Sequence, residues 1–358
     1  MTARREIGFG VVGLGMGQHH ALAITNAKGA KLVAVCDVDE ERLDKVVAQY
    51  GCQGYVEYRD LLADKEVEAV AICTPSGMHV DMALEAVALG KHLIVEKPVD
   101  VRVERIERLI EAGRNAGVKM QAIFQSRTVP LHRRMKETIA GGRLGKIIGV
   151  HALLPWYRKQ SYYEGPHGSW KGTWAIDGGG SLMNQGVHTV DLLQWLVGRV
   201  RSVMGAFGVY AHEIEAEDTS VAVLKFENGA LGTLSTTTCA YPGLPQTVLI
   251  YGDRGTICVE EGALKVWKIQ GEQETEEEAQ MLNLYGPKEK RGETVASDPM
   301  AVGATGHQGE VEDLVEAIWT DREPYIPIES AKHAVEIVTA IYESGRTGRE
   351  VVIVKREP

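Results

Sequence analysis

A glycine-rich stretch near the N-terminus has the residue types that bind the phosphates of a dinucleotide. The literal pattern G-x-G-x-x-G falls on Gly8, Gly10 and Gly13, but this register would put two strand-forming valines inside the phosphate loop. A register that begins at Gly13 follows an apolar strand and precedes a helix. Gly13 then makes the tight turn, and Gly15 lets a pyrophosphate approach the backbone at the helix N-terminus. The expected cofactor-binding loop contains Gly13, Gly15 and Met16.

An acidic residue downstream supports this interpretation and indicates which dinucleotide binds. The third position of the fingerprint is Gln18 rather than glycine, and Gly17 comes one place early. Asp37 ends the apolar segment KLVAVCD, where an acid binds the ribose hydroxyls of adenosine. A carboxylate there repels a 2′-phosphate by up to about 4 kcal/mol at ~4 Å and an effective dielectric near 20. NAD is therefore expected rather than NADP; the alternative is an acid that merely ends a strand.

A histidine on an apolar helical segment has neighbours suited to acid–base chemistry. In SLMNQGVHTVDLLQWLVG, His188 follows Asn184 by four residues and precedes Asp191 by three, which places all three on one helical face. A histidine beside a carboxylate is a reasonable general base for a hydroxyl, worth roughly 10²–10⁴ in rate. The alternative is a hydrogen-bonded core histidine. No set of histidines and acids has convincing metal-site spacing, so no metal is expected.

Residues 1–125 alternate short apolar strands with helical patterns. The expected strands are IGFGVVG, KLVAVCD, VEAVAICT, KHLIVE and VKMQAIF. Between the second and third expected strands, apolar residues from Leu43 to Tyr50 recur at helical spacing, which predicts a helix that ends at Gly51. Such alternation predicts a doubly wound parallel sheet, an α/β Rossmann domain over residues 1–125 that binds NAD(P).

Residues 126–358 follow a different pattern. Long strands are expected in KIIGVHALL and RSVMGAFGVY, and TSVAVLKFENGALGTLSTTT predicts a hairpin around Asn228-Gly229. These segments predict an α+β domain with a large, mostly antiparallel open sheet and helices on one side. The acidic segment 270–299 lacks periodicity and is expected to be a long exposed loop. One apolar sheet face would otherwise be exposed, so we expect this domain to bind substrate and to form a homodimer or homotetramer.

Composition excludes several classes of protein. The chain of 358 residues has a formal charge of −10 and no basic stripe, which argues against a nucleic-acid partner. Its five cysteines are odd in number and form no C-x-x-C, as expected for reduced thiols in the cytoplasm. Arg4-Arg5 only faintly mimics a twin-arginine signal, because glycines follow. No run reaches the ~18 apolar residues of a membrane span, so a soluble protein without a membrane partner is expected.

Two further stretches make the sequence similar to a known family. They are VEKPV at residues 95–99 and DGGGSLMNQGVHTVDLL at residues 177–193. Together with the glycine loop and the closing YESGRTGREVVI, they make the chain resemble the Gfo/Idh/MocA oxidoreductases over essentially its whole length. That family includes glucose–fructose oxidoreductase and inositol dehydrogenase. The resemblance implies a pyridine nucleotide cofactor and a sugar-like substrate.

The resemblance also implies roles for matched residues. Lys97 is expected at the bottom of the substrate pocket beside the nicotinamide, where its ammonium holds the substrate hydroxyl and stabilises the alkoxide. Glu96 is expected to position Lys97 or the nicotinamide, and Pro98 to stiffen the turn. With His188 as the base, Lys97 and His188 are the expected catalytic pair.

The sequence departs from the family at one of these positions. Many members carry Asp where this chain has Asn184, and Asn cannot raise the pKa of a neighbouring imidazole as an anion would. We therefore expect Asn184 to bind substrate or to orient His188. Asp191 is expected to supply part of the negative charge that an aspartate at position 184 would place beside His188. The letters MNQ are similar to those of the branch that oxidises nucleotide-linked sugars.

Several other residues are candidates for binding. In CTPSGMHV, the residues Thr74, Pro75 and Ser76 follow the strand and would flank the nicotinamide ribose. His79 begins the next helix and is either a cofactor contact or a surface residue. Residues 155–174 concentrate aromatic and cationic side chains suited to a sugar and a phosphate or carboxylate; an oligomer interface is the alternative. The candidates are Thr74, Pro75, Ser76 and His79 for the cofactor, and Asn184, Asp191, Arg127, Trp170 and Lys171 for the substrate, with Arg158 beside them.

The expected function is that of an NAD-dependent dehydrogenase. It would transfer a hydride between NAD and a secondary hydroxyl of a sugar, cyclitol or nucleotide-sugar derivative. One alternative is an NAD-using glycosidase on the same scaffold, which oxidises its substrate transiently and takes the hydride back. Another is a non-catalytic regulatory protein that senses a nucleotide or sugar. Retention of both Lys97 and His188 argues against the latter.

Overall fold

The computed structural model describes residues 5–271, 273–288, 296 and 305–353. The chain divides into two compact units: Met1–Thr128 with Gly303–Lys332, and Val129–Val302 with His333–Pro358. The sequence suggested one boundary near residue 125. The structure adds that a late segment, residues 303–332, returns to the first unit.

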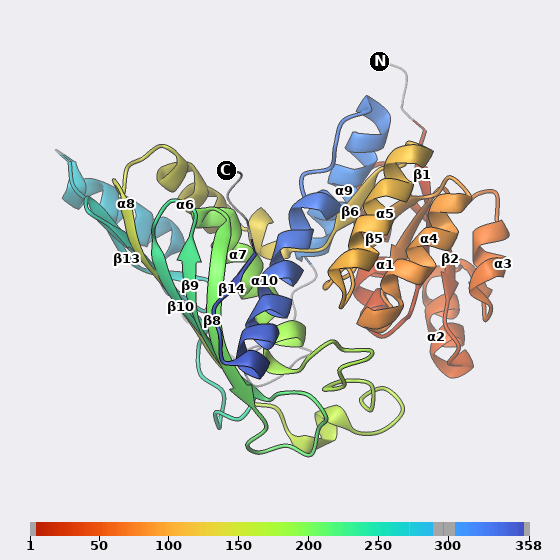
Figure 1. Ribbon diagram of the computed structural model, residues 1–358. Coiled ribbons are helices and arrows are strands. Elements are labelled where there is room, and N and C mark those ends of the chain that lie inside the picture. The colour runs from red at the N-terminus through yellow and green to blue at the C-terminus, as the bar shows by residue number, and fades with distance from the viewer. Residues whose placement is uncertain (1–4, 272, 289–295, 297–304, 354–358) are drawn as a thin grey trace. The chain divides into compact units, whose positions relative to one another are not determined.

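The first unit contains a six-stranded sheet in the order β3-β2-β1-β4-β5-β6, and every pair of neighbouring strands is parallel (Figure 1). Strands β1 and β4 are buried at every residue, as expected for a sheet covered on both faces. The strand order reverses between β1 and β4, where ligands bind in doubly wound folds. The strands are β1 (Ile7–Val12), β2 (Ala30–Cys36), β3 (Gln53–Tyr55), β4 (Ala69–Ile72), β5 (His92–Val95) and β6 (Met120–Ala122).

Six helices belong to this unit: α1 (Gly17–Asn26), α2 (Glu40–Tyr50), α3 (Tyr58–Ala63), α4 (His79–Ala88), α5 (Val103–Ala116) and α9 (Thr305–Thr320). Helix α2 begins where Asp39 accepts a hydrogen bond from the amide of Arg42, and it ends at Gly51 in the left-handed conformation. Helix α9, the returning segment, packs against α1 and adds Val311, Leu314 and Val315 to the core of the unit. The first unit is therefore built from two separate stretches of chain.

The second unit contains an eight-stranded sheet in the order β13-β12-β11-β7-β10-β9-β8-β14. Only β7 and β10 pair in parallel; the other neighbours are antiparallel, so the predicted fold class is confirmed. The strands are β7 (Ile147–Pro155), β8 (Val200–Gly208), β9 (Thr219–Phe226), β10 (Leu231–Thr237), β11 (Thr247–Gly252), β12 (Gly255–Glu260), β13 (Ala263–Ile269) and β14 (Val351–Val352).

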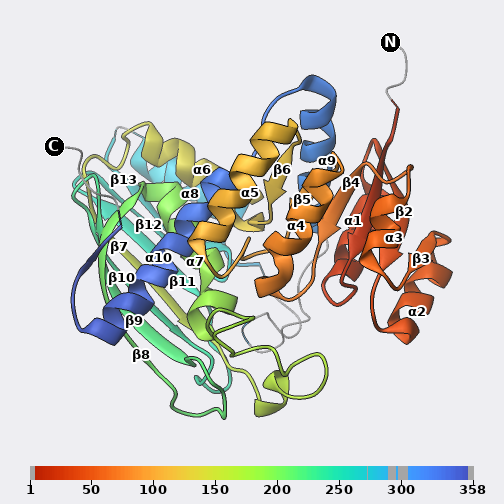
Figure 2. The same cartoon turned by 45° about the vertical axis from the view of Figure 1, so that its right-hand side comes forward.

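Helices of this unit are α6 (Pro130–Ala140), α7 (Val187–Val197), α8 (Glu274–Tyr285) and α10 (Ile328–Thr347), which begins within the residues of the first unit. Figure 2 shows α10 running along the sheet. The expectation of an exposed loop at 270–299 is wrong for residues 274–285, which form α8. A bidentate pair between Arg143 and Glu277 at 2.7 and 2.6 Å holds this helix. The rest of that expectation falls mainly on 289–295 and 297–299, outside the described residues.

Among the described residues, no helix has both the length and the apolar character that a membrane span requires. All five cysteines are free thiols.

Candidate active site

The glycine loop after β1 has the shape of a phosphate cradle. Gly13 has φ of +86°, and a Cβ there would lie 2.7 Å from the carbonyl oxygen of Cys73, so only glycine fits. A Cβ on Gly15 would meet nothing closer than 4.0 Å, which leaves the backbone open to an approaching ligand. Helix α1 starts at Gly17 with no acid in its first turn, and no described side chain caps it. Its N-terminus is thus suited to an anion, and the residues fit a dinucleotide.

Gly17 does what the third glycine of the fingerprint does, which is to allow close packing of the helix on the strand. The sequence analysis did not assign this role to Gly17. A Cβ at this position would lie 2.9 Å from Cγ1 of Val11 in β1, so the glycine lets α1 pack closely on the strand. Gln18, at the formal third position, is exposed and donates its side-chain amide to the carbonyl of Leu14 at 2.9 Å. The sequence did contain an indication of this role, because Gly17 stands one residue before the formal third position of the fingerprint.

Asp37 lies at the carboxyl end of β2 and is tied to the glycine loop. Its side chain is 7% exposed, and it accepts hydrogen bonds from the amides of Leu14 at 2.6 Å and Asp39 at 2.9 Å. The guanidinium of Arg42 lies 3.5 Å from the same carboxylate. The structure therefore fixes this anion beside the loop, while its contact with a ribose stays a prediction.

The loop after β4 is joined to the loop after β5 by a histidine. His79 is 1% exposed; its Nδ1 lies 2.8 Å from the carbonyl oxygen of Pro98 and its Nε2 lies 2.7 Å from that of Thr74. Burial lowers the pKa of this imidazole, although both carbonyls oppose the shift. The ring bridges two loops at the carboxyl edge of the sheet. Ser76 is also buried, and Pro75 precedes it in an extended conformation, so their contacts with a cofactor stay predictions.

Glu96 and Lys97 directly follow β5. Glu96 is 5% exposed; its Oε2 accepts the amide of Lys97 at 3.0 Å, and its Oε1 lies 2.8 Å from Nε2 of His20 in α1. Burial alone would raise the pKa of Glu96. The hydrogen bond and charge of His20, with the charges of His307 and Lys97, hold it well below its ordinary range. Lys97 is half-buried, and its bond to Pro98 is cis.

In the second unit, the expected single helix over 181–198 has two parts. Residues Ser181–Gly186 form a π-helical turn, and α7 continues from Val187. Extra-wide turns of this kind are frequently found at functional sites. His188 is half-buried on α7. Asp191 is fully buried and accepts a hydrogen bond from Gln194 at 3.1 Å, and its expected contact with substrate stays a prediction.

Asn184 belongs to a chain of polar side chains. It donates to Oδ1 of Asp177 at 2.6 Å, and its own oxygen accepts from Gln185 at 2.8 Å. Gln185 also donates to the hydroxyl of Tyr162 at 2.9 Å, and Arg158 donates to Gln185 at 3.3 Å. Burial and the charge of Asp177 raise the pKa of Tyr162 to about 12, so its hydroxyl stays protonated. Sequence reasoning missed Asp177, Gln185 and Tyr162, although MNQ and the aromatic segment held the signal.

The N-terminus of the π-helical turn is held by a buried carboxylate. Glu217 has no exposed surface and accepts hydrogen bonds from the amides of Gly180, Ser181 and Leu182 at 2.9, 3.1 and 2.9 Å. The hydroxyls of Ser181 and Tyr342 also donate to it. Burial raises the pKa of Glu217, and these hydrogen bonds oppose the shift. Its position before β9 gave no sequence signal, because its partners are distant in the chain.

The other candidates for substrate binding have defined neighbours. Lys171 is half-buried with its Nζ 3.9 Å from the ring centroid of Tyr162 and 6.0 Å from that of Trp170. Arg127 is 3% exposed, and its guanidinium donates to the side chain and carbonyl of Ser330 at 2.9 and 3.1 Å. Arg127 thus anchors its loop within the first unit, and its expected place at a pocket rim stays a prediction.

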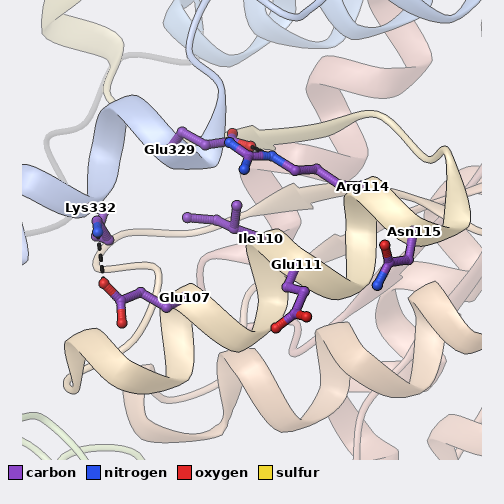
Figure 3. A pocket seen from close by; sticks show the side chains of 7 residues that line it. All are labelled: Glu107, Ile110, Glu111, Arg114, Asn115, Glu329 and Lys332. Carbon is purple, nitrogen blue, oxygen red and sulfur yellow. Dashed lines mark hydrogen bonds and ion pairs between the residues drawn. The ribbon is translucent and has the colours of Figure 1, made fainter.

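Among the described residues, two groups of side chains could hold a metal ion: His20, Glu96 and His307, and His212, Asp218 and Cys239. Hydrogen bonds account for the second, because Asp218 accepts the amides of Tyr210, Ala211 and His212 at 2.8–3.1 Å. The pocket in Figure 3 is separate and lies between α5 and the start of α10. Its charges pair with one another, Lys332 with Glu107 at 2.8 Å and Arg114 with Glu329 at 3.3 Å.

Comparisons with known proteins agree with this architecture. Residues 7–124 match the model of an oxidoreductase family with an NAD-binding Rossmann fold, and residues 132–258 match the GFO/IDH/MocA C-terminal domain. The first unit is therefore an NAD-binding Rossmann domain, as the glycine loop and Asp37 predict.

Three relatives illustrate the range of the similarity. The structure of the WlbA dehydrogenase from Bordetella pertussis, in complex with NADH and UDP-GlcNAcA, is 31% identical, with a TM-score of 0.86 over 99% of this chain and 100% of that one. A myo-inositol 2-dehydrogenase of Thermotoga maritima is 27% identical over 69% of this chain and 73% of its own. The scyllo-inositol 2-dehydrogenase (NAD(+)) of Bacillus subtilis is 28% identical over 70% and 72%, respectively.

Proposed function

Because this chain belongs to the Gfo/Idh/MocA family of NAD-binding oxidoreductases, we propose that it oxidises a secondary hydroxyl of a nucleotide-linked sugar. The observation that carries the substrate class is the similarity, over the whole length, to a dehydrogenase crystallised with a UDP-sugar. The inositol dehydrogenases of Thermotoga maritima and Bacillus subtilis are 27% and 28% identical to this chain, below the 31% of that structure. The cation-bearing segment before α7 also favours a substrate with anionic groups over a neutral cyclitol.

In the proposed mechanism, NAD when bound accepts the hydride that the substrate carbon gives up. His188 acts as general base and takes the proton of the reacting hydroxyl, a role for which a half-buried imidazole is suited. Lys97 donates a hydrogen bond from its ammonium to the same oxygen and stabilises the negative charge that develops there. The reverse reaction uses the same groups with the proton transfers inverted.

The polar chain through Asn184 has a separate role in this proposal. Its side-chain oxygen and amide are both engaged, by Gln185 and Asp177, so it orients neighbouring groups rather than exchanging protons. Arg158 and Lys171 stack on the ring of Tyr162, with 5.6 and 3.9 Å to its centroid. We propose that Lys171 binds the phosphates or a sugar carboxylate of the substrate, and that Trp170 contacts the sugar ring. Arg158 is 2% exposed and donates to the carbonyls of Tyr157 and Ala296 at 2.8 and 3.0 Å, so it holds the segment in place.

The experiment is a panel of nucleotide sugars, free sugars and inositols, with NADH formation followed by absorbance. We expect turnover with one or more nucleotide sugars, and a fall in kcat of roughly 10²–10⁴ in Lys97→Met and His188→Asn. The matched control is Lys45→Met, which alters an exposed side chain and is expected to retain activity. NADH formation with inositols alone would contradict the substrate class.

The same panel separates the alternative functions. Cleavage of a glycoside without net NADH formation would indicate the NAD-using glycosidase. Tight binding of nucleotide and sugar with no turnover would indicate a sensor. Undiminished activity in the Lys97→Met and His188→Asn double variant would refute the proposed mechanism.

We also propose that the chain forms a homodimer or homotetramer through the outer face of the eight-stranded sheet. Exposed apolar side chains gather there on β7 to β10, and Met204 lies directly opposite Val223 across β8 and β9. The set comprises Ile148, Leu153, Met204, Val221, Val223 and Leu231. Light scattering is expected to give an oligomer that Val223→Lys dissociates and that the control Leu284→Lys, on α8, leaves intact. A monomeric parent protein would refute this assembly.

A further inference from the structure

Four ionisable side chains are buried together beneath the carboxyl edge of the Rossmann sheet. They come from α1, from the turn after β5 and from the returning helix α9. None is more than 5% exposed. The group, called here the buried histidine–carboxylate cluster, consists of His20, Glu96, His307 and Glu310.

Short contacts join the members in a row. Nε2 of His20 lies 2.8 Å from Oε1 of Glu96, and the rings of His20 and His307 have centroids 4.4 Å apart and planes tilted by 40°. Nδ1 of His307 lies 3.4 Å from Oε2 of Glu310, while its Nε2 lies 3.2 Å from the side-chain amide of Gln125. A change in protonation at Glu310 is therefore felt at Glu96 through two imidazoles.

The pKa values of the cluster members are shifted in different directions. Burial lowers the pKa of His20, and its hydrogen bond to Glu96 opposes the shift, while the same contact lowers the pKa of Glu96. Burial also acts to lower the pKa of His307, but Glu310 and Glu96 outweigh it and raise that pKa. Burial raises the pKa of Glu310 to about 7 against the opposing charge of His307. Other charged or titratable groups that interact with the cluster are His19, Cys73, His79 and Lys97.

The cluster lies at the end of the sheet where the reactive half of a dinucleotide binds. Asp37 follows β2 and Glu96 follows β5, on opposite sides of the switch point between β1 and β4. An adenosine bound at Asp37 leaves the nicotinamide end of the molecule on the side of β4 and β5. Glu96 also accepts the amide of Lys97, which the proposed mechanism uses.

We propose that the buried histidine–carboxylate cluster selects between the oxidised and the reduced cofactor through its net charge. The nicotinamide ring is cationic in NAD⁺ and neutral in NADH, so a fixed anion stabilises the oxidised form relative to the reduced one. Glu96 supplies that anion, and His20 keeps it ionised. His307 and Glu310 adjust the total charge, which becomes more negative as this pair loses its proton near neutral pH.

The expected size of the effect follows from the interaction of single charges. One charge added within about 10 Å of the ring, at an effective dielectric near 20, changes the ratio of the two dissociation constants by about tenfold. The inference concerns cofactor binding alone, so it holds whichever sugar is the substrate and does not depend on the outcome of the substrate panel.

The experiment measures the dissociation constants of NAD⁺ and NADH without substrate, by fluorescence titration between about pH 6 and about pH 8. In the parent protein, we expect the preference for NAD⁺ over NADH to rise by about tenfold as pH increases through 7. Glu310→Gln, which removes the ionisation and keeps the shape, is expected to abolish this rise. The matched control is Glu312→Gln on the same helix, whose carboxylate accepts the amide of Lys28 at 3.1 Å at the surface; it should behave like the parent.

A second measurement uses only the parent protein and does not depend on the folding of a variant. Calorimetry near pH 7, in buffers of different ionisation enthalpy, counts the protons released on binding. We expect NAD⁺ binding to release more protons than NADH binding, because a cationic ring lowers the proton affinity of the cluster. Equal proton release, a pH-independent ratio, or a stoichiometric metal ion bound by the purified protein would each overturn the proposal.

Discussion

Replacing Glu217 with glutamine tests how the helix that carries His188 is positioned. In the parent, Oε1 accepts from the amides of Gly180 and Leu182 and from Tyr342, while Oε2 accepts from the amide and hydroxyl of Ser181. A glutamine amide keeps only one of these oxygens and turns an N–H₂ group toward the donors of the other. At least two buried donors then lose their acceptor, at about 1–3 kcal/mol each.

The expected loss in the free energy of unfolding is therefore about 2–5 kcal/mol, measured by chemical denaturation. Because burial raises the pKa of Glu217, its contribution to stability is complete below the pKa of the unfolded chain and is lost as pH rises through the raised pKa. Glutamine does not titrate, so the free energy of unfolding of the variant is expected to stay constant over the pH range in which that of the parent falls.

The functional readout separates positioning from general damage. We expect kcat in Glu217→Gln to fall by about 10–100-fold, because small misplacements of a reacting group are costly, while the dissociation constant of NAD is unchanged. The control Glu215→Gln changes an exposed carboxylate two residues away and should cost at most about 0.5 kcal/mol. A loss below about 1 kcal/mol in Glu217→Gln, or an equal loss in the control, would refute the reasoning.

Two further substitutions test other parts of the site. Asp37→Asn removes the anion expected to repel a 2′-phosphate, so the preference for NAD over NADP should fall by about tenfold or more, as measured by fluorescence titration of both cofactors; an unchanged preference would place the discrimination elsewhere. Asn184→Asp would put a second carboxylate at the 2.6 Å contact with Asp177, where the two acids must share a proton. Sharing a proton raises the pKa of this pair in the folded variant, so the free energy of unfolding of the variant falls as pH rises through that pKa. We expect it to be about 1–3 kcal/mol below that of the parent near pH 8 and equal to it near pH 5.

The sequence predicts the features that depend on local pattern. Strand–helix alternation gave the Rossmann unit, and the hairpin around Asn228-Gly229 appears as antiparallel β9 and β10 with Gly229 at φ of +89°. The phosphate loop was found because its conformational requirement falls on adjacent residues. These features use contacts that are close in the chain, where periodicity and turn chemistry carry the information.

Features that depend on distant contacts escaped prediction. Helix α8 has almost no apolar period and only Met281 buried, and its ion pair with Arg143 comes from a segment far back in the chain. Glu217 resembles any acid before a strand until its partners on the π-helical turn and on α10 are known. The spacing argument for Asn184 assumed a regular helix, and the π-helical turn invalidates that assumption.

The discontinuous composition of the first unit has a practical consequence for dissecting the protein. Val311, Leu314 and Val315 of α9 complete a core whose other members lie before residue 124. A truncated fragment ending near residue 128 would expose that apolar surface and leave out His307. Recombinant cofactor-binding fragments, or chimaeras that exchange substrate specificity between homologues, will need to graft residues 305–332 back onto the N-terminal half, for instance by circular permutation.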